Sequence, residues 1–269
     1  MPLHRRNARP SRALVLSLAG AGLGLLAFAP AAAATVQTSL PAVADATLRQ
    51  QQANQNRGDD DLVRLGWAQG SRALVRFDQA AIAAAVGSGQ LVSARLELNV
   101  DGTGESWGNT PQNVDAHRVT ASWTEAGATW NCGIDSKPSD NKADCNPQWN
   151  GGSFVAAPTA SVPHTKQTRG VVSFDVTSDV AAFLAGTANQ GWLLKKANET
   201  LSGRIDDTAR EGAAAQRPRL VLAVDSGGAP DTTPPSVAIT APPTGSRLAT
   251  AIPTITATYS DAGSGIDPA

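Results

Sequence analysis

The sequence predicts an all-β protein, an antiparallel jelly-roll-type β-sandwich with one or two short helices. Short runs rich in Val, Leu, Ile and Phe alternate with turns rich in Gly, Asn, Asp and Pro, a pattern typical of sandwiches. Few stretches show the 3.6-residue period of a long helix. The predicted strands include residues 71–78, 92–100, 114–119, 171–174, 191–195 and 218–224.

The strand over residues 92–100 carries the clearest signal. Its apolar side chains alternate with polar ones: one side holds Ala94, Leu96, Leu98 and Val100, and the other holds Arg95, Glu97 and Asn99. A period of two predicts one buried face and one solvated face.

Two short helices interrupt the strands. Residues 79–86 are rich in alanine, and residues 179–185 follow Ser178, a residue type that caps helix N-termini. Asp179 is favourable at a helix start. The second helix places apolar side chains on one face, those of Val180, Phe183 and Leu184.

Residues 1–34 have the pattern of a secretory signal peptide. A basic start with four arginines precedes an apolar run over residues 13–30 and a small-residue cleavage site, Ala32-Ala33-Ala34. The alternative is a retained membrane anchor, but the apolar run is rich in Gly and Ala and short for a bilayer span of about 20 residues. We therefore expect a secreted, extracellular or cell-surface protein.

The charge of the mature chain is mildly acidic. The full chain has 22 basic and 23 acidic residues, and the leader removes four arginines and no acid, so the net charge falls from −1 to −5. This balance argues against nucleic acid and against anionic membranes as partners once the leader is cleaved.

The two cysteines, Cys132 and Cys145, predict a disulfide. An even, closely spaced pair in an exported chain favours a bridge, and the polar residues between them indicate a surface loop. Two zinc ligands are the alternative, but further ligands at short spacing are missing.

The domain organisation follows from composition. Residues 35–226 are long enough for one β-sandwich domain with its own core. Residues 227–235 are a linker dense in Pro and Gly, and residues 236–269 contain two β-like runs.

Several sequence blocks occur in the order typical of one family. They include Leu74-Val-Arg-Phe-Asp78, Val92-Ser-Ala-Arg-Leu-Glu-Leu98, the Trp123-to-Trp130 block, Val172-Ser-Phe-Asp-Val-Thr177 followed by Gly191-Trp-Leu-Leu194, and Arg217-Pro-Arg-Leu-Val-Leu222. Over residues 42–224 the chain resembles the DNRLRE domain, which is related to disaggregatase repeats and grouped with carbohydrate-binding modules. The family's "SRE" signature is present only as Ala209-Arg210-Glu211, and residues 132–152 look like an insertion.

The resemblance implies a jelly-roll sandwich that serves as one module of a large exported bacterial protein. The stretches 231–240 and 259–266 resemble the start of a bacterial immunoglobulin-like domain, which needs about 100 residues to close. We therefore expect residues 236–269 to be an incomplete immunoglobulin-like segment of a longer chain whose other domains are partners of this one.

Catalytic motifs are missing from the sequence. No nucleophile elbow, phosphate-binding loop or His-Glu-x-x-His is present. The two histidines of the mature chain, His117 and His164, are interpreted as structural.

Acidic residues in loops are candidate ligands of a structural calcium ion, and no other cofactor is expected. The candidates are Asp45, Asp59, Asp60 and Asp61, because calcium takes hard oxygen ligands from loops. Solvated turn aspartates are the alternative.

The six tryptophans divide into two groups. Trp123, Trp130 and Trp192 lie beside apolar strand residues and predict core packing. The carbohydrate-binding candidates are Trp67, Trp107 and Trp149, which lie in polar, Gly- or Asn-rich loops; an exposed indole can stack on a sugar ring. The alternative is that each covers a small satellite cluster.

The leading functional hypothesis is a non-catalytic extracellular module that binds polysaccharide or cell-surface glycan. An architectural or adhesive spacer is the second hypothesis. A polysaccharide lyase or hydrolase is the third, and it requires a cleft with converging carboxylates.

Overall fold

The computed structural model describes residues 35–66, 70–225, 236–241, 243, 245 and 256–260 of the chain. The predicted signal peptide and the predicted linker lie outside these residues, and so does Trp67. No helix among the described residues is long and apolar enough to cross a membrane.

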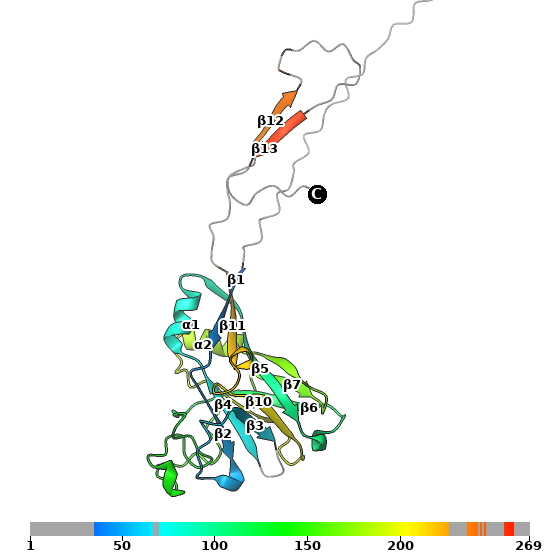
Figure 1. Ribbon diagram of the computed structural model, residues 1–269. Coiled ribbons are helices and arrows are strands. Elements are labelled where there is room, and N and C mark those ends of the chain that lie inside the picture. Colours follow the sequence, from blue (N-terminus) through cyan, green and yellow to red (C-terminus); the bar gives the residue numbers. More distant parts are fainter. Residues whose placement is uncertain are drawn as a thin grey trace, which may run out of the picture. The chain divides into compact units, whose positions relative to one another are not determined.

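The main domain is built from eleven strands and two short helices (Figure 1). The strands are β1 (Thr35–Pro41), β2 (Ala44–Arg49), β3 (Leu62–Gly66), β4 (Ser71–Arg76), β5 (Gln90–Thr103), β6 (Gln112–Arg118), β7 (Ala160–His164), β8 (Gly170–Asp175), β9 (Trp192–Lys196), β10 (Arg204–Thr208) and β11 (Arg219–Asp225). The helices are α1 (Gln79–Val86) and α2 (Thr177–Leu184), and the 3-10 turns are η1 (Gln50–Gln52), η2 (Glu105–Trp107), η3 (Pro138–Asp140) and η4 (Ala214–Gln216). The prediction of an all-β sandwich with short helices is confirmed, and every predicted strand of the main domain is present.

The strands pair antiparallel in the order β1-β11-β5-β10-β3-β4-β9-β6-β7, with β2 on the free edge of β4 and β8 on the free edge of β5. Strand β5 is the longest and pairs with β11 near its start, β10 near its end and β8 along its other edge. The sheet curls so that β5 and β11 face β4, β6 and β9 across a shared apolar core.

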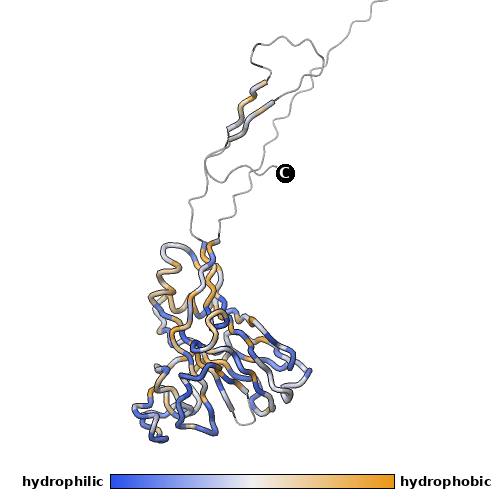
Figure 2. Tube along the Cα trace, viewed as in Figure 1, coloured by the Kyte–Doolittle hydropathy of each residue, from blue (hydrophilic) through white to orange (hydrophobic). Residues whose placement is uncertain are grey.

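That core follows the alternation seen in the sequence. Ala94, Leu96, Leu98 and Val100 of β5 are at most 2 % exposed, whereas Arg95, Glu97 and Asn99 between them are half-buried on the outer face. Figure 2 shows hydrophobic segments along the strands and both helices, with hydrophilic colours in many of the loops. Packing of these apolar faces is the main stabilising contribution to such a domain.

A second, smaller cluster lies on the outer side of β2, β4 and β9. Leu48, Leu74 and Leu193 pack there against Trp123 and Trp130 from the long segment between β6 and β7. The prediction that Trp123, Trp130 and Trp192 are core residues is confirmed, since their side chains are 1 %, 8 % and 0 % exposed.

The N-terminus of α2 differs from the expected one. The helix begins at Thr177 rather than Asp179, and no side chain caps it in the manner predicted for Ser178. Instead, Oδ1 of Asp175 accepts bonds from the amide (3.0 Å) and the hydroxyl (2.6 Å) of Thr177. An aspartate that bonds two residues onward forms its own turn, which is why the boundary moved.

The C-terminal residues that the structure describes form one antiparallel hairpin. Strand β12 (Ser236–Ala241) pairs with β13 (Thr256–Ser260). Both coincide with the two β-like runs of the sequence, while the immunoglobulin-like assignment stays a prediction.

Candidate functional site

Trp107 is not exposed, so its selection as a carbohydrate-stacking residue was wrong. Its side chain is 0 % exposed within the main core, and its Nε1 donates a 2.8 Å hydrogen bond to the carbonyl of His164. The ammonium of Lys196 lies 4.2 Å from the ring centroid, and burial lowers the pKa of Lys196 to about 8. A buried ring cannot stack on a polymer, because the ligand has no access to its face.

The polar, glycine-rich neighbourhood of Trp107 was misleading because it marks a tight turn. Strand β5 ends there and η2 turns the indole inward, against the backbone of Gly203. A Cβ on Gly203 would lie 2.7 Å from Cα of Trp107. The close approach therefore requires a glycine at position 203.

Trp149 covers the second cluster. Its Nε1 donates a 2.9 Å hydrogen bond to the carbonyl of Thr129, and its ring lies over Gly133. The side chain is half-buried, so part of the ring is accessible. The sequence analysis left open the alternative that a loop tryptophan covers a small hydrophobic cluster instead of binding sugar. Trp149 has the position expected from that alternative.

The predicted disulfide between Cys132 and Cys145 is present, with the two Cα atoms 5.8 Å apart. Cys132 is fully buried beside the second cluster, and its amide donates to Oγ1 of Thr129. The bridge therefore fixes the loop over residues 133–144 to the packed part of the domain.

The two histidines that the structure describes, His117 and His164, are buried. Nδ1 of His117 lies 2.9 Å from the carbonyl of Val155, and Nδ1 of His164 lies 2.9 Å from that of Val162. Burial lowers the pKa of His164, against the opposing effect of its bond to the carbonyl of Val162. These positions agree with the structural interpretation of both side chains.

The four calcium candidates do not gather into one site. Asp59 is exposed. Oδ1 of Asp60 lies 3.8 Å from Nη1 of Arg57, and Oδ2 of Asp60 lies 3.8 Å from Nη1 of Arg64. Asp45 instead meets two glutamates from distant parts of the chain. We call Asp45, Glu125 and Glu211 the carboxylate triad, because one oxygen from each lies within 4.8 Å of the others.

The triad is organised by Arg210. Its guanidinium makes two bonds to Glu125, at 2.9 and 2.7 Å, and also pairs with Glu211. Its backbone amide donates to Oδ2 of Asp45 at 2.6 Å, while the amide of Asp45 donates to Glu125 at 2.9 Å. One guanidinium faces three carboxyl groups, so the site has excess negative charge when all three are ionised.

Asp45 has the most unusual environment of the three. It is 1 % exposed, and its Oδ1 is buried without a hydrogen-bond partner among the described residues. Burial raises the pKa of Asp45 to about 7, with further contributions from the charges of Glu211 and Glu125, while the bond from the Arg210 amide lowers it. A buried carboxyl group in this setting either keeps a proton or faces a cation.

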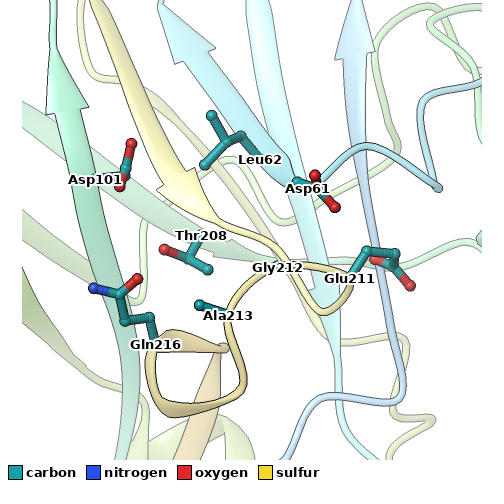
Figure 3. Close-up of a pocket in the computed structure, with 8 residues that line it drawn as sticks. All are labelled: Asp61, Leu62, Asp101, Thr208, Glu211, Gly212, Ala213 and Gln216. Carbon is teal, nitrogen blue, oxygen red and sulfur yellow. The ribbon is translucent and has the colours of Figure 1, made fainter.

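A pocket of about 360 Å³ opens on the outer face of the sheet next to the triad. We call it the acidic pocket; its lining residues are Asp61, Leu62, Asp101, Thr208, Glu211, Gly212, Ala213 and Gln216. They come from β3 and the residue before it, from β5, from the end of β10 and from the segment that follows β10 through η4. Figure 3 shows Asp101 and Gln216 on one side, Asp61 and Glu211 on the other, and Thr208 between them.

The loop after β10 shapes this pocket. The amide of Ala209 donates to the carbonyl of Asp61 at 2.9 Å, which ties the loop to the start of β3. A Cβ on Gly212 would lie 2.7 Å from that same carbonyl oxygen and 2.7 Å from Cγ2 of Thr208. The absence of a side chain at Gly212 therefore allows the loop to cross above the strands.

Arginines and aspartates form an ion-pair network on the neighbouring part of the same face. Oδ1 of Asp206 lies 3.2 Å from Nε of Arg64, and Oδ2 of Asp206 lies 2.8 Å from Nη2 of Arg204. Burial raises the pKa of Asp206, against the opposing charges of Arg204 and Arg64. Asp207 points to the core side of β10, where burial and the charge of Asp206 raise its pKa to about 8.

Two of the site residues lie in motifs that the sequence analysis had identified. Glu211 belongs to the altered Ala209-Arg210-Glu211 motif, and Glu125 belongs to the Trp123-to-Trp130 block. The side chains of Asp101, Thr208 and Gln216 carried no local pattern. They belong to the pocket because strand pairing and the loop bring them together.

The comparisons with known proteins point to one family. A family model described as carbohydrate-binding module family 96 matches residues 36–224. A comparison with curated proteins found no match to the chain.

Proposed function

The chain belongs to carbohydrate-binding module family 96, and on this premise we propose that its sandwich domain binds polysaccharide, without catalysis, at the acidic pocket. The observation that carries the proposal is a polar depression of about 360 Å³ on the outer face of the sheet. That volume falls within the roughly 300–1,000 Å³ range of ligand pockets.

The lining offers the contacts that a sugar residue requires. Carboxylates accept hydrogen bonds from hydroxyl groups, and the amide of Gln216 both accepts and donates them. Leu62 and Ala213 supply small apolar surfaces for the C–H face of a pyranose ring. No aromatic residue is among the described residues that line this pocket, so hydrogen bonding is the main source of orientation here.

An architectural spacer without a ligand is the second candidate function. It is favoured by the burial of Trp107, which removes a stacking platform from the surface, and by the position of Trp149, which leaves only part of its ring accessible. A module of this kind would contribute length and stability to a larger chain.

We further propose that the carboxylate triad holds a structural calcium ion. The donor atoms are hard oxygens, and calcium takes six to eight such ligands, including water. The buried, unpartnered Oδ1 of Asp45 supports this assignment, since a cation would satisfy it. The ion would join β2 to the loop after β10 and thereby brace one wall of the acidic pocket.

Export is proposed on two grounds. The N-terminal 34 residues have the order of basic, apolar and small segments that signal peptides share. The disulfide between Cys132 and Cys145 suits an oxidising compartment. Both support a secreted or cell-surface protein whose glycan partner is met outside the cell.

A glycan array with the secreted protein tests the proposed function, followed by affinity measurements on two variants. Gln216→Ala removes an exposed amide of the pocket, and Gln37→Ala removes an exposed amide on β1, outside it. We expect Gln216→Ala to weaken binding by about 1 kcal/mol, the usual contribution of a hydrogen bond, and Gln37→Ala to leave it unchanged. Absence of any glycan ligand on the array would favour the spacer.

A further inference from the structure

Strand β1 is an edge of the main sheet, and among the described strands it pairs with β11 alone. The amide of Ala42 donates to the carbonyl of Pro218 at 3.2 Å, one step beyond the pair of Pro41 with Arg219. Hydrogen-bonded and non-bonded pairs alternate in an antiparallel ladder, so the even-numbered residues of β1 bond to β11. The backbone polar groups of the odd-numbered residues therefore point to the free side: Thr35, Gln37, Ser39 and Pro41.

The position of Pro41 agrees with this assignment, because proline has no N–H and is tolerated on the free side of an edge strand. Within the described part of the chain, no hydrogen bond reaches the outward backbone groups of Gln37 and Ser39. Both residues are also exposed. A row of this kind is a template for pairing with another strand.

The other edges of the main domain are protected. On β2, the amide of Thr47 donates to the carbonyl of Arg57 at 3.3 Å. Strand β7 contains Pro163, and β8 contains the charged Asp175; proline and charge are both devices that prevent edge pairing. Strand β1 has no charged residue, and its one proline is the last residue of the strand.

A second copy of the strand fits this edge better than the segment that follows β11 in the same chain. That segment, residues 227–235, is dense in Pro and Gly and is a poor partner in a ladder. Strand β1 is seven residues long, so a two-fold axis at its centre, Thr38, pairs the whole strand with its own copy. Because the strand is uncharged, this pairing brings no like charges together.

The same register covers exposed apolar surface. Val36, Thr38 and Leu40 lie on one face of the strand, and Leu40 packs against the main core. Val36 is 53 % exposed in the single copy. In the pair, Val36 lies opposite Leu40 of the second copy and Thr38 lies opposite its own counterpart. Cross-strand contacts between such side chains stabilise a sheet.

We propose that the domain self-associates through β1, which pairs antiparallel with β1 of a second copy about a two-fold axis at Thr38. Gln37 of each copy then lies opposite Ser39 of the other, and their outward backbone groups form the main hydrogen bonds. A single strand pair buries less than the roughly 1,200 Å² of a stable interface. The dimer is therefore weak, and we expect it to form between about 0.01 and 1 mM.

Cysteine cross-linking of the secreted protein tests the register. The two cysteines of the chain are joined in one disulfide, so an added cysteine reports on its own. Thr38→Cys places two thiols directly opposite each other, and we expect a disulfide-linked dimer under mild oxidation. Ser39→Cys is the matched control, because position 39 faces position 37 of the second copy and its two thiols stay apart.

Sedimentation equilibrium measures the association itself. The unaltered protein should dimerise reversibly as its concentration rises to about 1 mM. Thr38→Lys and Thr38→Glu should each be monomeric, because like charges lie opposite each other, and an equimolar mixture of the two should dimerise again. Gln37→Pro removes one outward N–H from each copy and should weaken the dimer about tenfold or more. Melting curves show whether each variant is folded.

Several outcomes would overturn the proposal. One is a protein that stays monomeric at about 1 mM, and another is Ser39→Cys linking as readily as Thr38→Cys. A dimer that persists unchanged in Thr38→Lys and in Gln37→Pro has its interface elsewhere, which also overturns it. Should Thr38→Lys fail to fold, the comparison of the two cysteine variants decides. None of these results bears on glycan binding, because β1 lies outside the acidic pocket.

Discussion

The backbone amide of Arg210 donates a 2.6 Å hydrogen bond to Oδ2 of Asp45, a residue 165 positions earlier in the chain. This contact ties β2 to the loop that forms one wall of the acidic pocket. The same arginine pairs with Glu125 and Glu211. Arg210 therefore connects segments around Asp45, Glu125 and Glu211, two of which are distant in sequence from its own loop.

Calcium should stabilise the protein against heat through this group. At a concentration about 100 times the dissociation constant, a bound ion contributes about 2.7 kcal/mol to the unfolding free energy, or roughly 5–10 °C for a domain of this size. Asp45→Asn should abolish the shift, and Asp59→Asn should preserve it. Melting curves recorded with calcium and with a chelator check this, and identical wild-type curves in both would contradict it.

Stability without calcium should fall as the pH rises from about 5 to 8. The pKa of Asp45 is raised to about 7 and that of Asp207 to about 8, both mainly by burial. The folded protein therefore holds protons that the unfolded chain releases above its ordinary carboxyl pKa of about 3.9, so this contribution is complete below that pH and is lost towards 8.

Urea denaturation at several pH values in a chelator checks this decline. Asp207→Asn should flatten it, because an amide mimics the neutral carboxyl group and does not titrate. Stability that increases with pH across this window would show that the two buried carboxyl groups are not responsible, and a slope unaffected by Asp207→Asn would rule out Asp207.

Reduction of the disulfide should lower the unfolding free energy by about 3 kcal/mol, the value expected for a loop of this size. The cysteines are 13 residues apart. Calorimetry with and without a reductant measures the loss. The Cys132→Ser/Cys145→Ser double variant should melt at the lower temperature in both buffers, and a further drop on adding reductant would point to another cause.

Trp107→Ala should destabilise the domain by about 3–5 kcal/mol, as expected for a large aromatic side chain lost from a core. Trp149→Ala should cost less, because that side chain is only half-buried. Chemical denaturation of both variants gives the comparison. A larger loss for Trp149→Ala would mean that the second cluster contributes more than the main core.

Local patterns in the sequence were sufficient to predict much of this architecture. The alternation along β5 identified its buried face, and the paired cysteines identified the disulfide. The first prediction depends on short-range periodicity, and the second depends on the chemistry of cysteine. The helix over residues 79–86 was located correctly from its alanine content. In the structure Asp78 also caps it, with its carboxylate accepting from the amide of Ala81.

The site required information that local patterns do not contain. Asp45 and Glu211 meet only because β2 lies beside the loop after β10, and nothing near either residue specifies that pairing. Trp107 was assigned to the surface because its flanking residues are polar and its turn is rich in glycine. The direction of one side chain at the end of β5 was decided by tertiary packing against Gly203 and Lys196.

Mapping of backbone amide chemical shifts by NMR, during titration with an oligosaccharide selected on the glycan array, tests glycan binding at the acidic pocket most directly. The account predicts that the largest shifts fall on Asp61, Asp101, Thr208, Gly212 and Gln216. Shifts concentrated around Trp149 and the disulfide loop, or no shifts at saturating sugar, would contradict it.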